Sequence, residues 1–197
     1  MKNGKQNIRA ALLESGKKEF LEHGFDKASL RTICQNAGVT TGAFYSHFEK
    51  KEDLFSALVE DDLRLYNQMY DGLMDRIIDQ KSTQLDSEAL LMSFIMDHRD
   101  LFKLLFDCAQ GTKYENFKAD LLVKFNDTYQ DFFDAYNPGA VDPAVTNTIL
   151  RMKFEQYCAM IYSDYSRDEV MRITRRIRDF TRAGFEALLN TSFEGPG

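Results

Sequence analysis

The sequence predicts an all-α protein: an N-terminal three-helix domain containing a helix-turn-helix, followed by a helical bundle, with about nine helices in all. Only three prolines and eleven glycines occur in 197 residues, so long helices meet few breaks. No run of alternating apolar and polar residues bounded by turns is present, which argues against strands. Residues 28–55 are typical of two short helices joined by a glycine turn and followed at once by a third helix.

The helix-turn-helix is indicated by its caps and its apolar anchors. Ser29 can cap the first short helix, and Gly38 allows the left-handed backbone that ends it. Thr40 can cap the second helix. Phe44 and Phe48 lie four residues apart and should anchor that helix to the core of the domain. Its remaining face is then free to enter the major groove of DNA.

Clear start and stop signals divide the rest of the chain into helices. Thr112–Glu115 and Ser166–Glu169 have the spacing of capping boxes. Residues 137–139 (Asn-Pro-Gly) end one helix, and Asp142 followed by proline begins the next. The predicted helices cover about 51–78, 87–96, 101–108, 112–136, 143–165 and 166–191, before a tail at 192–197.

Several motifs of the N-terminal segment occur together and in register: Ser29, Ile33-Cys34, Ala37-Gly38-Val39-Thr40, Gly42, Tyr45-Ser46-His47-Phe48 and Lys51-Glu52-Asp53-Leu54, with Phe20 and Gly24-Phe25 upstream. Residues 8–55 thereby resemble the DNA-binding domain of the TetR family of bacterial transcriptional regulators. Lys17, Glu19 and Cys34 depart from the family pattern. The resemblance implies a helix-turn-helix DNA-binding domain at 1–55 and a helical effector-binding and dimerisation domain at 56–197.

The resemblance also implies which residues contact DNA. Phosphates would be held by polar and basic side chains, namely Ser29, Arg31, Thr40, Tyr45, His47 and Lys51. Base edges would be met by the small and polar residues Thr41, Gly42, Ala43 and Ser46.

The charge distribution fits a DNA partner, although the net charge is −6. Residues 1–50 hold eight Lys/Arg and five Asp/Glu, a net of +3, whereas residues 51–197 hold seventeen and twenty-six, a net of −9. A basic reading domain on an acidic body would confine DNA contact to the reading domain. The alternative is a modest statistical fluctuation of charge.

TetR-like regulators bind small molecules within the helical body, so the resemblance implies an effector site there. The candidates combine aromatic side chains with two polar ones: Phe94, His98, Arg99, Phe102, Phe106, Tyr129, Phe133 and Tyr157. An aromatic-lined cavity would suit a lipophilic or aromatic molecule. The same residues would also serve as ordinary core packing or, for His98 and Arg99, as surface or helix-end residues.

The last two helices form a four-helix dimer interface in the family, which implies this role for residues 143–192. The candidate contacts are Met160, Ile161, Ile173, Ile177, Phe180, Gly184 and Phe185. The alternative is that these residues fill the core of a single chain.

Other chemistry has little support in the sequence. No pair among His23, His47 and His98 has metal-ligand spacing, and neither a phosphate-binding glycine loop nor a nucleophile elbow is present. We therefore expect no metal, no cofactor and no enzymatic activity. The three cysteines are expected to be buried reduced thiols. The polar start of the chain and the lack of a long apolar run predict a cytoplasmic protein without a membrane partner.

The predicted function is that of a ligand-responsive transcriptional regulator, a repressor that binds a palindromic DNA operator as a homodimer. A small molecule bound in the C-terminal domain would release it. One alternative is a helical ligand- or protein-binding module with a vestigial DNA-binding domain, which would have lost the outward polar and basic residues present here. A helix-bundle enzyme is a third reading, against which the missing catalytic residues argue.

Overall fold

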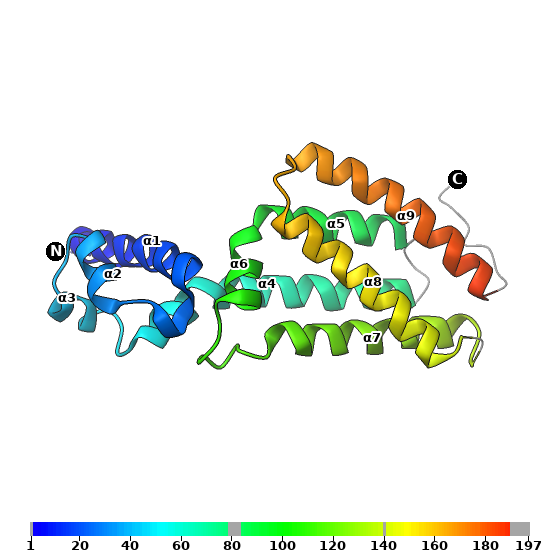
Figure 1. The fold of residues 1–197 in the computed structure, drawn as a ribbon, viewed down its shortest axis with the longest axis horizontal. Coiled ribbons are helices and arrows are strands. Elements are labelled where there is room, and N and C mark those ends of the chain that lie inside the picture. The colour runs from blue at the N-terminus through cyan, green and yellow to red at the C-terminus, as the bar shows by residue number, and fades with distance from the viewer. Residues whose placement is uncertain (1, 79–83, 140, 190–197) are drawn as a thin grey trace. The chain divides into compact units, whose positions relative to one another are not determined.

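The computed structural model describes residues 2–78, 84–139 and 141–189, which contain nine helices and no strand within those ranges (Figure 1). The helices, in chain order, are α1 (Lys2–Lys27), α2 (Leu30–Asn36), α3 (Thr41–Tyr45), α4 (Lys51–Ile78), α5 (Gln84–Asp97), α6 (Arg99–Asp107), α7 (Phe117–Tyr136), α8 (Pro143–Tyr162) and α9 (Arg167–Leu189). The predicted all-α fold class is confirmed.

The chain divides into two compact units. The N-terminal unit comprises Met1–Leu65 and Asp100–Lys118, and the C-terminal unit comprises Tyr66–Arg99 and Ala119–Gly197. Helix α4 therefore contributes to both units, and nearly all of α6 belongs with the first three helices. The domain boundary after residue 55 stays a prediction.

Aromatic side chains form the centre of the N-terminal unit. Phe20 and Phe55 are fully buried, and their ring centroids lie 5.3 Å apart. Phe25 packs against both rings and donates its backbone N–H to the carbonyl oxygen of Cys108, at 2.9 Å. Gly24, at φ +73°, interrupts α1 just before Phe25, so the chain turns there towards α2.

The C-terminal unit is built around an aromatic face of α7. Its buried residues recur at helical spacing: Leu121, Phe125, Tyr129, Phe132 and Phe133. Helix α9 packs along α5 (Figure 1). Both predicted N-terminal caps in this unit are confirmed: Asp142 accepts from the Ala144 N–H at 2.8 Å, and Ser166 and Glu169 form a capping box.

Three helix boundaries differ from the sequence prediction. Thr112–Glu115 forms turns rather than a helix start, because the Glu115 carboxylate accepts from the Gly111 N–H and Thr112 Oγ1 accepts from the Tyr114 N–H. Helix α7 therefore starts at Phe117. Helix α8 ends at Tyr162, three residues early, and α5 begins at Gln84. The predicted tail at 192–197 lies outside the described residues.

Candidate nucleic-acid interface

Helices α2 and α3 are held in place by two capped N-termini and one left-handed glycine. Ser29 Oγ accepts from the Thr32 N–H at 3.2 Å, and Thr40 Oγ1 accepts from the Ala43 N–H at 3.1 Å. Gly38 has φ +69° between the two helices, and the Val39 N–H donates back to the Cys34 carbonyl at 2.9 Å. All three features predicted from the sequence are confirmed.

Helix α3 is anchored by aromatic side chains and exposes its other faces. Phe44 is fully buried and Phe48 is 5% exposed, with ring centroids 5.5 Å apart. Tyr45, the neighbour of Phe44, is 58% exposed. The residues predicted to contact DNA are exposed (Arg31, Thr40, Thr41, Gly42, Tyr45, Ser46) or partly buried (Ser29, Ala43, His47, Lys51). Helix α3 thus presents a small and polar surface of the kind that can approach DNA closely.

The capping hydroxyls can serve a second purpose. In Ser29 and Thr40 the oxygen accepts a backbone hydrogen bond, whereas the O–H hydrogen can still be donated. A phosphate oxygen accepts such a bond without disturbing the cap. Ser46 differs, because its Oγ donates to the Ala43 carbonyl at 2.7 Å, so its hydroxyl hydrogen is already used within the helix.

Lys51 is bound inside the N-terminal unit. Its Nζ donates to the carbonyl oxygens of Phe25, at 2.5 Å, and Ala28, at 3.0 Å, and lies 4.4 Å from the centroid of the Phe25 ring. Burial lowers the pKa of Lys51, against the attraction of Asp26 and Glu19. These bonds fix the end of α1, so the phosphate contact predicted for Lys51 would have to compete with them.

Two residues of the N-terminal unit were not singled out as functional from the sequence. Glu19 is 6% exposed and accepts from the Ser29 N–H at 2.9 Å, which positions the start of α2. Arg9 is exposed on α1, and its guanidinium lies 5.3 Å from the Phe48 ring, next to α3. Arg9 adds a cation to the surface around the helix-turn-helix. No local sequence pattern predicts its proximity to α3, because Arg9 lies far from α3 along the chain.

The residues predicted to bind an effector fall in both units. Phe102 and Phe106 belong to the N-terminal unit, whereas Phe94, His98, Arg99, Tyr129, Phe133 and Tyr157 belong to the C-terminal unit. His98 stacks on Phe94 with ring centroids 4.1 Å apart. Arg99 donates to the carbonyl oxygens of Ser163, at 3.3 Å, and Tyr165, at 3.0 Å, and so ties the start of α6 to the α8–α9 turn.

A buried ion pair in the C-terminal unit was missed. Lys153 Nζ on α8 and Glu88 Oε1 on α5 are 2.5 Å apart, and the Tyr157 hydroxyl donates to the same oxygen at 3.3 Å. The sequence does indicate that Lys153 is buried, because it lies on the same helical stripe as the apolar Leu150 and Tyr157. A charge on a buried stripe requires a partner, although spacing along the chain does not say which one.

The residues predicted to form a dimer interface divide by exposure. Met160, Ile161 and Phe185 are buried within the C-terminal unit, Ile173 and Ile177 are partly exposed, and Gly184 and Phe180 are exposed, Phe180 by 78%. Helix α8 also exposes apolar side chains, with Met152 at 66% and Val145 at 40%. Helices α8 and α9 therefore both expose apolar side chains to solvent in the single chain.

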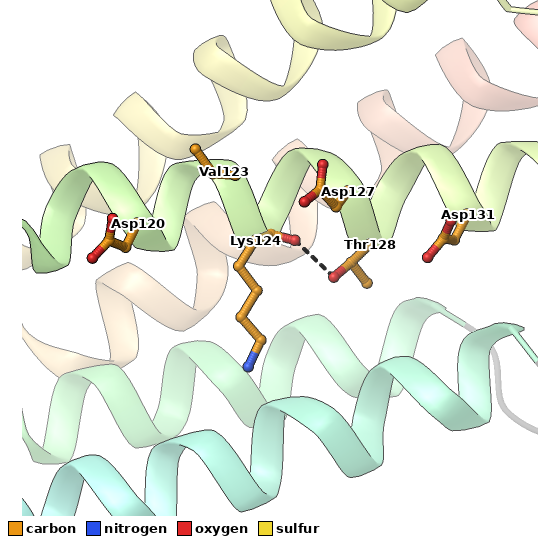
Figure 2. A pocket seen from close by; sticks show the side chains of 6 residues that line it. All are labelled: Asp120, Val123, Lys124, Asp127, Thr128 and Asp131. Atoms are coloured by element: carbon orange, nitrogen blue, oxygen red, sulfur yellow. Dashed lines mark hydrogen bonds between the residues drawn. The ribbon is translucent and has the colours of Figure 1, made fainter.

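An open pocket of about 350 Å³ lies along α7. Figure 2 shows the side chains that line it. It is lined by Asp120, Val123, Lys124, Asp127, Thr128 and Asp131, none of them predicted as an effector contact. Lys124 extends towards α4, where it pairs with Asp71 at 2.6 Å. The pocket is thus a shallow surface formed by one helix, with three acidic side chains.

Cys34, Cys108 and Cys158 are buried and form no disulfide, as predicted, and burial raises the pKa of Cys34 and Cys108. Within the described residues, no three His, Cys, Asp or Glu side chains gather in a way that could hold a metal ion. None of the described helices has the length and apolar character needed to cross a membrane.

Sequence comparison relates the N-terminal part of the chain to known regulators. Residues 12–58 match the model described as bacterial regulatory proteins, tetR family. The HTH-type transcriptional repressor AcnR of Corynebacterium glutamicum is 39% identical over 56 residues, which is 28% of this chain and 30% of AcnR. The HTH-type transcriptional regulator UidR of Escherichia coli is 34% identical over 62 residues, 32% of each chain. The chain thus matches about a third of the length of these relatives.

Structural comparison covers the C-terminal part as well. A transcriptional regulator of the TetR/AcrR type from Aquifex aeolicus VF5 superposes with a TM-score of 0.63 over 88% of this chain and 99% of its own, at 16% sequence identity. At that identity the likeness is one of fold. The resemblance to the TetR family is therefore confirmed: residues 12–58 carry the family's sequence pattern, and the chain has the fold of TetR/AcrR regulators.

Proposed function

We propose that this protein is a DNA-binding transcriptional regulator, a repressor that acts in the cytoplasm on a palindromic operator and is released by a small molecule. The observation that carries the proposal is the exposed surface of α3, anchored from behind by Phe44 and Phe48. The match of residues 12–58 to the tetR model supports it. No enzymatic activity is part of the proposal.

DNA binding is tested by a gel shift on the DNA upstream of the protein's own gene, over a series of salt concentrations. Specific retardation that weakens as salt rises is expected, because phosphate contacts release counterions. Arg31→Ala should lower the slope of log K against log salt by about one unit, since Arg31 is exposed on α2. No retardation at any salt would favour the alternative of a binding module without DNA activity.

Dimerisation through α8 and α9 is the second part of the proposal. A protein that reads a palindrome needs two recognition helices related by a two-fold axis. The exposed apolar side chains of Phe180, Met152 and Val145 lie on these two helices. A second copy of the chain would remove this apolar area from water, which is the driving force of most homodimers.

Sedimentation of the full chain tests the interface. Phe180→Asp should shift the protein towards monomer, because a carboxylate would replace a side chain that is 78% exposed in the single chain and would be buried in the proposed dimer. Leu90→Asp is the matched control, since Leu90 is a 53% exposed apolar residue on α5. Equal association of both variants would contradict the assignment.

Release by a small molecule is the third part. Ligand binding in the C-terminal unit would shift the population towards a state whose two α3 helices do not fit the operator. The buried aromatic face of α7 supports a lipophilic or aromatic ligand. A compound that raises the melting temperature and weakens operator binding would have both expected properties.

A further inference from the structure

The interior of the C-terminal unit holds a charged cluster formed by Glu88, Lys153 and Tyr157. Glu88 is 5%, Lys153 4% and Tyr157 7% exposed. Lys153 Nζ and the Tyr157 hydroxyl both donate to Oε1 of Glu88, at 2.5 and 3.3 Å. All three groups belong to the same unit.

Stability alone is a weak reason for such a cluster. Two charges lose their hydration when they are buried, and their attraction repays this cost only in part. Well-packed apolar side chains in the same volume often give an equally stable or more stable protein. The aromatic surroundings would accommodate them, because Phe125 lies 6.0 Å from Tyr157 and 6.4 Å from Phe154, ring centroid to centroid.

The arrangement of donors points to an anion. Lys153 and Tyr157 are four residues apart on α8, so they stay on one helix face when the acceptor moves. Burial and the nearby Glu88 raise the pKa of Tyr157, so its hydroxyl keeps its proton and remains a donor. Glu88 comes from a different helix, α5, and is therefore the exchangeable member of the cluster.

We propose that Lys153 and Tyr157 form a binding site for the carboxylate of an organic acid with an aromatic or apolar body, and that Glu88 occupies this site when the acid is absent. The incoming carboxylate would accept the two hydrogen bonds that Glu88 now accepts. Its apolar part would lie against Phe125 and the aromatic residues around it. This proposal rests on the proposed function, since the acid would be the effector.

Three compounds of equal skeleton test the head group. Calorimetric titration of the full chain without DNA would use 4-phenylbutyrate, 4-phenylbutanamide and 4-phenylbutylamine. The carboxylate should bind at least about tenfold more tightly than the amide, because charge-assisted hydrogen bonds are roughly twice as strong as neutral ones. Preferential binding of the amine would overturn the proposal, since Glu88 and the tyrosine rings would then hold a cation. Equal binding of all three, or none, would overturn it as well.

Variants of the cluster give a signature that a purely structural ion pair would not. Glu88→Gln removes the internal competitor and should raise affinity for 4-phenylbutyrate about tenfold, whereas Lys153→Met should abolish binding. Tyr157→Phe keeps the ring and should weaken binding by about threefold to tenfold. If Glu88→Gln fails to fold, Tyr157→Phe and the double variant E88Q/K153M test the site instead. An affinity for 4-phenylbutyrate that is unchanged in both variants would contradict the proposed site.

The test separates this proposal from the proposed function. Operator binding by the unliganded protein is measured independently by gel shift. If DNA is bound but 4-phenylbutyrate is not, the acid site fails and the regulator stands. If the acid is bound but no DNA is retarded, the site stands without a regulatory role.

Discussion

Two buried glutamates, one in each unit, show how differently the two regions use charge. Glu19 is 6% exposed and accepts from the backbone N–H of Ser29 at 2.9 Å, and its charge opposes the burial that lowers the pKa of Lys51. Glu88 is 5% exposed and bonds to the side chains of Lys153 and Tyr157 within an aromatic core. Glu19 satisfies a helix terminus that would otherwise lack an acceptor, so its role is structural. Glu88 satisfies no helix terminus; it accepts only from the side chains of Lys153 and Tyr157, and it is the member of that cluster proposed to be exchangeable.

The polar groups of the N-terminal unit thus fix the fold, whereas the buried cluster of the C-terminal unit is proposed to respond to a ligand. The N-terminal unit fixes α3 with caps and backbone hydrogen bonds, and the exposed polar groups of that helix are the ones proposed to contact DNA. The C-terminal unit buries the ion pair of Lys153 and Glu88 in its interior.

Breaking the buried pair should have the largest effect on stability. Lys153→Met leaves the Glu88 carboxylate buried and without its ammonium partner, which should lower the free energy of unfolding by about 3–5 kcal/mol. The double variant E88Q/K153M should recover most of this loss, because no charge remains buried. Urea denaturation of the three proteins measures both values. If Lys153→Met is as stable as the original protein, the Glu88 carboxylate is not desolvated and the prediction is wrong.

Lys51→Met should have a smaller effect, confined to the N-terminal unit. The methionine can still pack on Phe25 but cannot donate to the carbonyl oxygens of Phe25 and Ala28. Loss of hydrogen bonds from a charged group should cost about 1.5–3 kcal/mol. Denaturation gives the value, with Lys50→Met as control, since Lys50 is exposed and its Nζ pairs with Glu52 at the surface. Equal stability of the two variants would contradict the role of Lys51.

Glu19→Gln should cost less again, about 1 kcal/mol, because the amide oxygen can still accept from the Ser29 N–H. Glu19→Leu would remove the acceptor altogether and should cost more than Glu19→Gln. Hydrogen exchange of the Ser29 amide reports the change directly. An unchanged exchange rate in Glu19→Leu would refute the proposed cap.

The sequence predicted local features well and distant pairings poorly. Ser29, Thr40, Asp142 and Ser166 act as caps because a cap needs only the next three residues, which the sequence displays. The Lys153–Glu88 pair joins residues 65 positions apart, and no local pattern names such a partner. The exposed α3 surface was predictable because its cap, its glycine turn and its apolar anchors are all close together in the sequence.

The α9 cap should have the smallest effect and a defined pH dependence. Hydrogen bonds from the Ser166 hydroxyl and backbone N–H lower the pKa of Glu169 below its usual 4.5. The stabilising contribution is therefore present above pH 4.5 and is lost as pH falls through the lowered pKa. The stability difference between the protein and Glu169→Gln should follow this profile in denaturation experiments from pH 7 to pH 3. A difference that grows in acid would contradict it.

The central claim is that the exposed surface of α3 binds DNA, and one titration tests it most directly. Fluorescence anisotropy would compare Tyr45→Ala with Val123→Ala, a control on α7 whose exposure, 59%, matches the 58% of Tyr45. Tyr45→Ala should weaken binding to the upstream DNA about tenfold with an unchanged melting temperature, and Val123→Ala should not. Equal affinity of both variants and the original protein would contradict the assignment of α3 as the recognition helix.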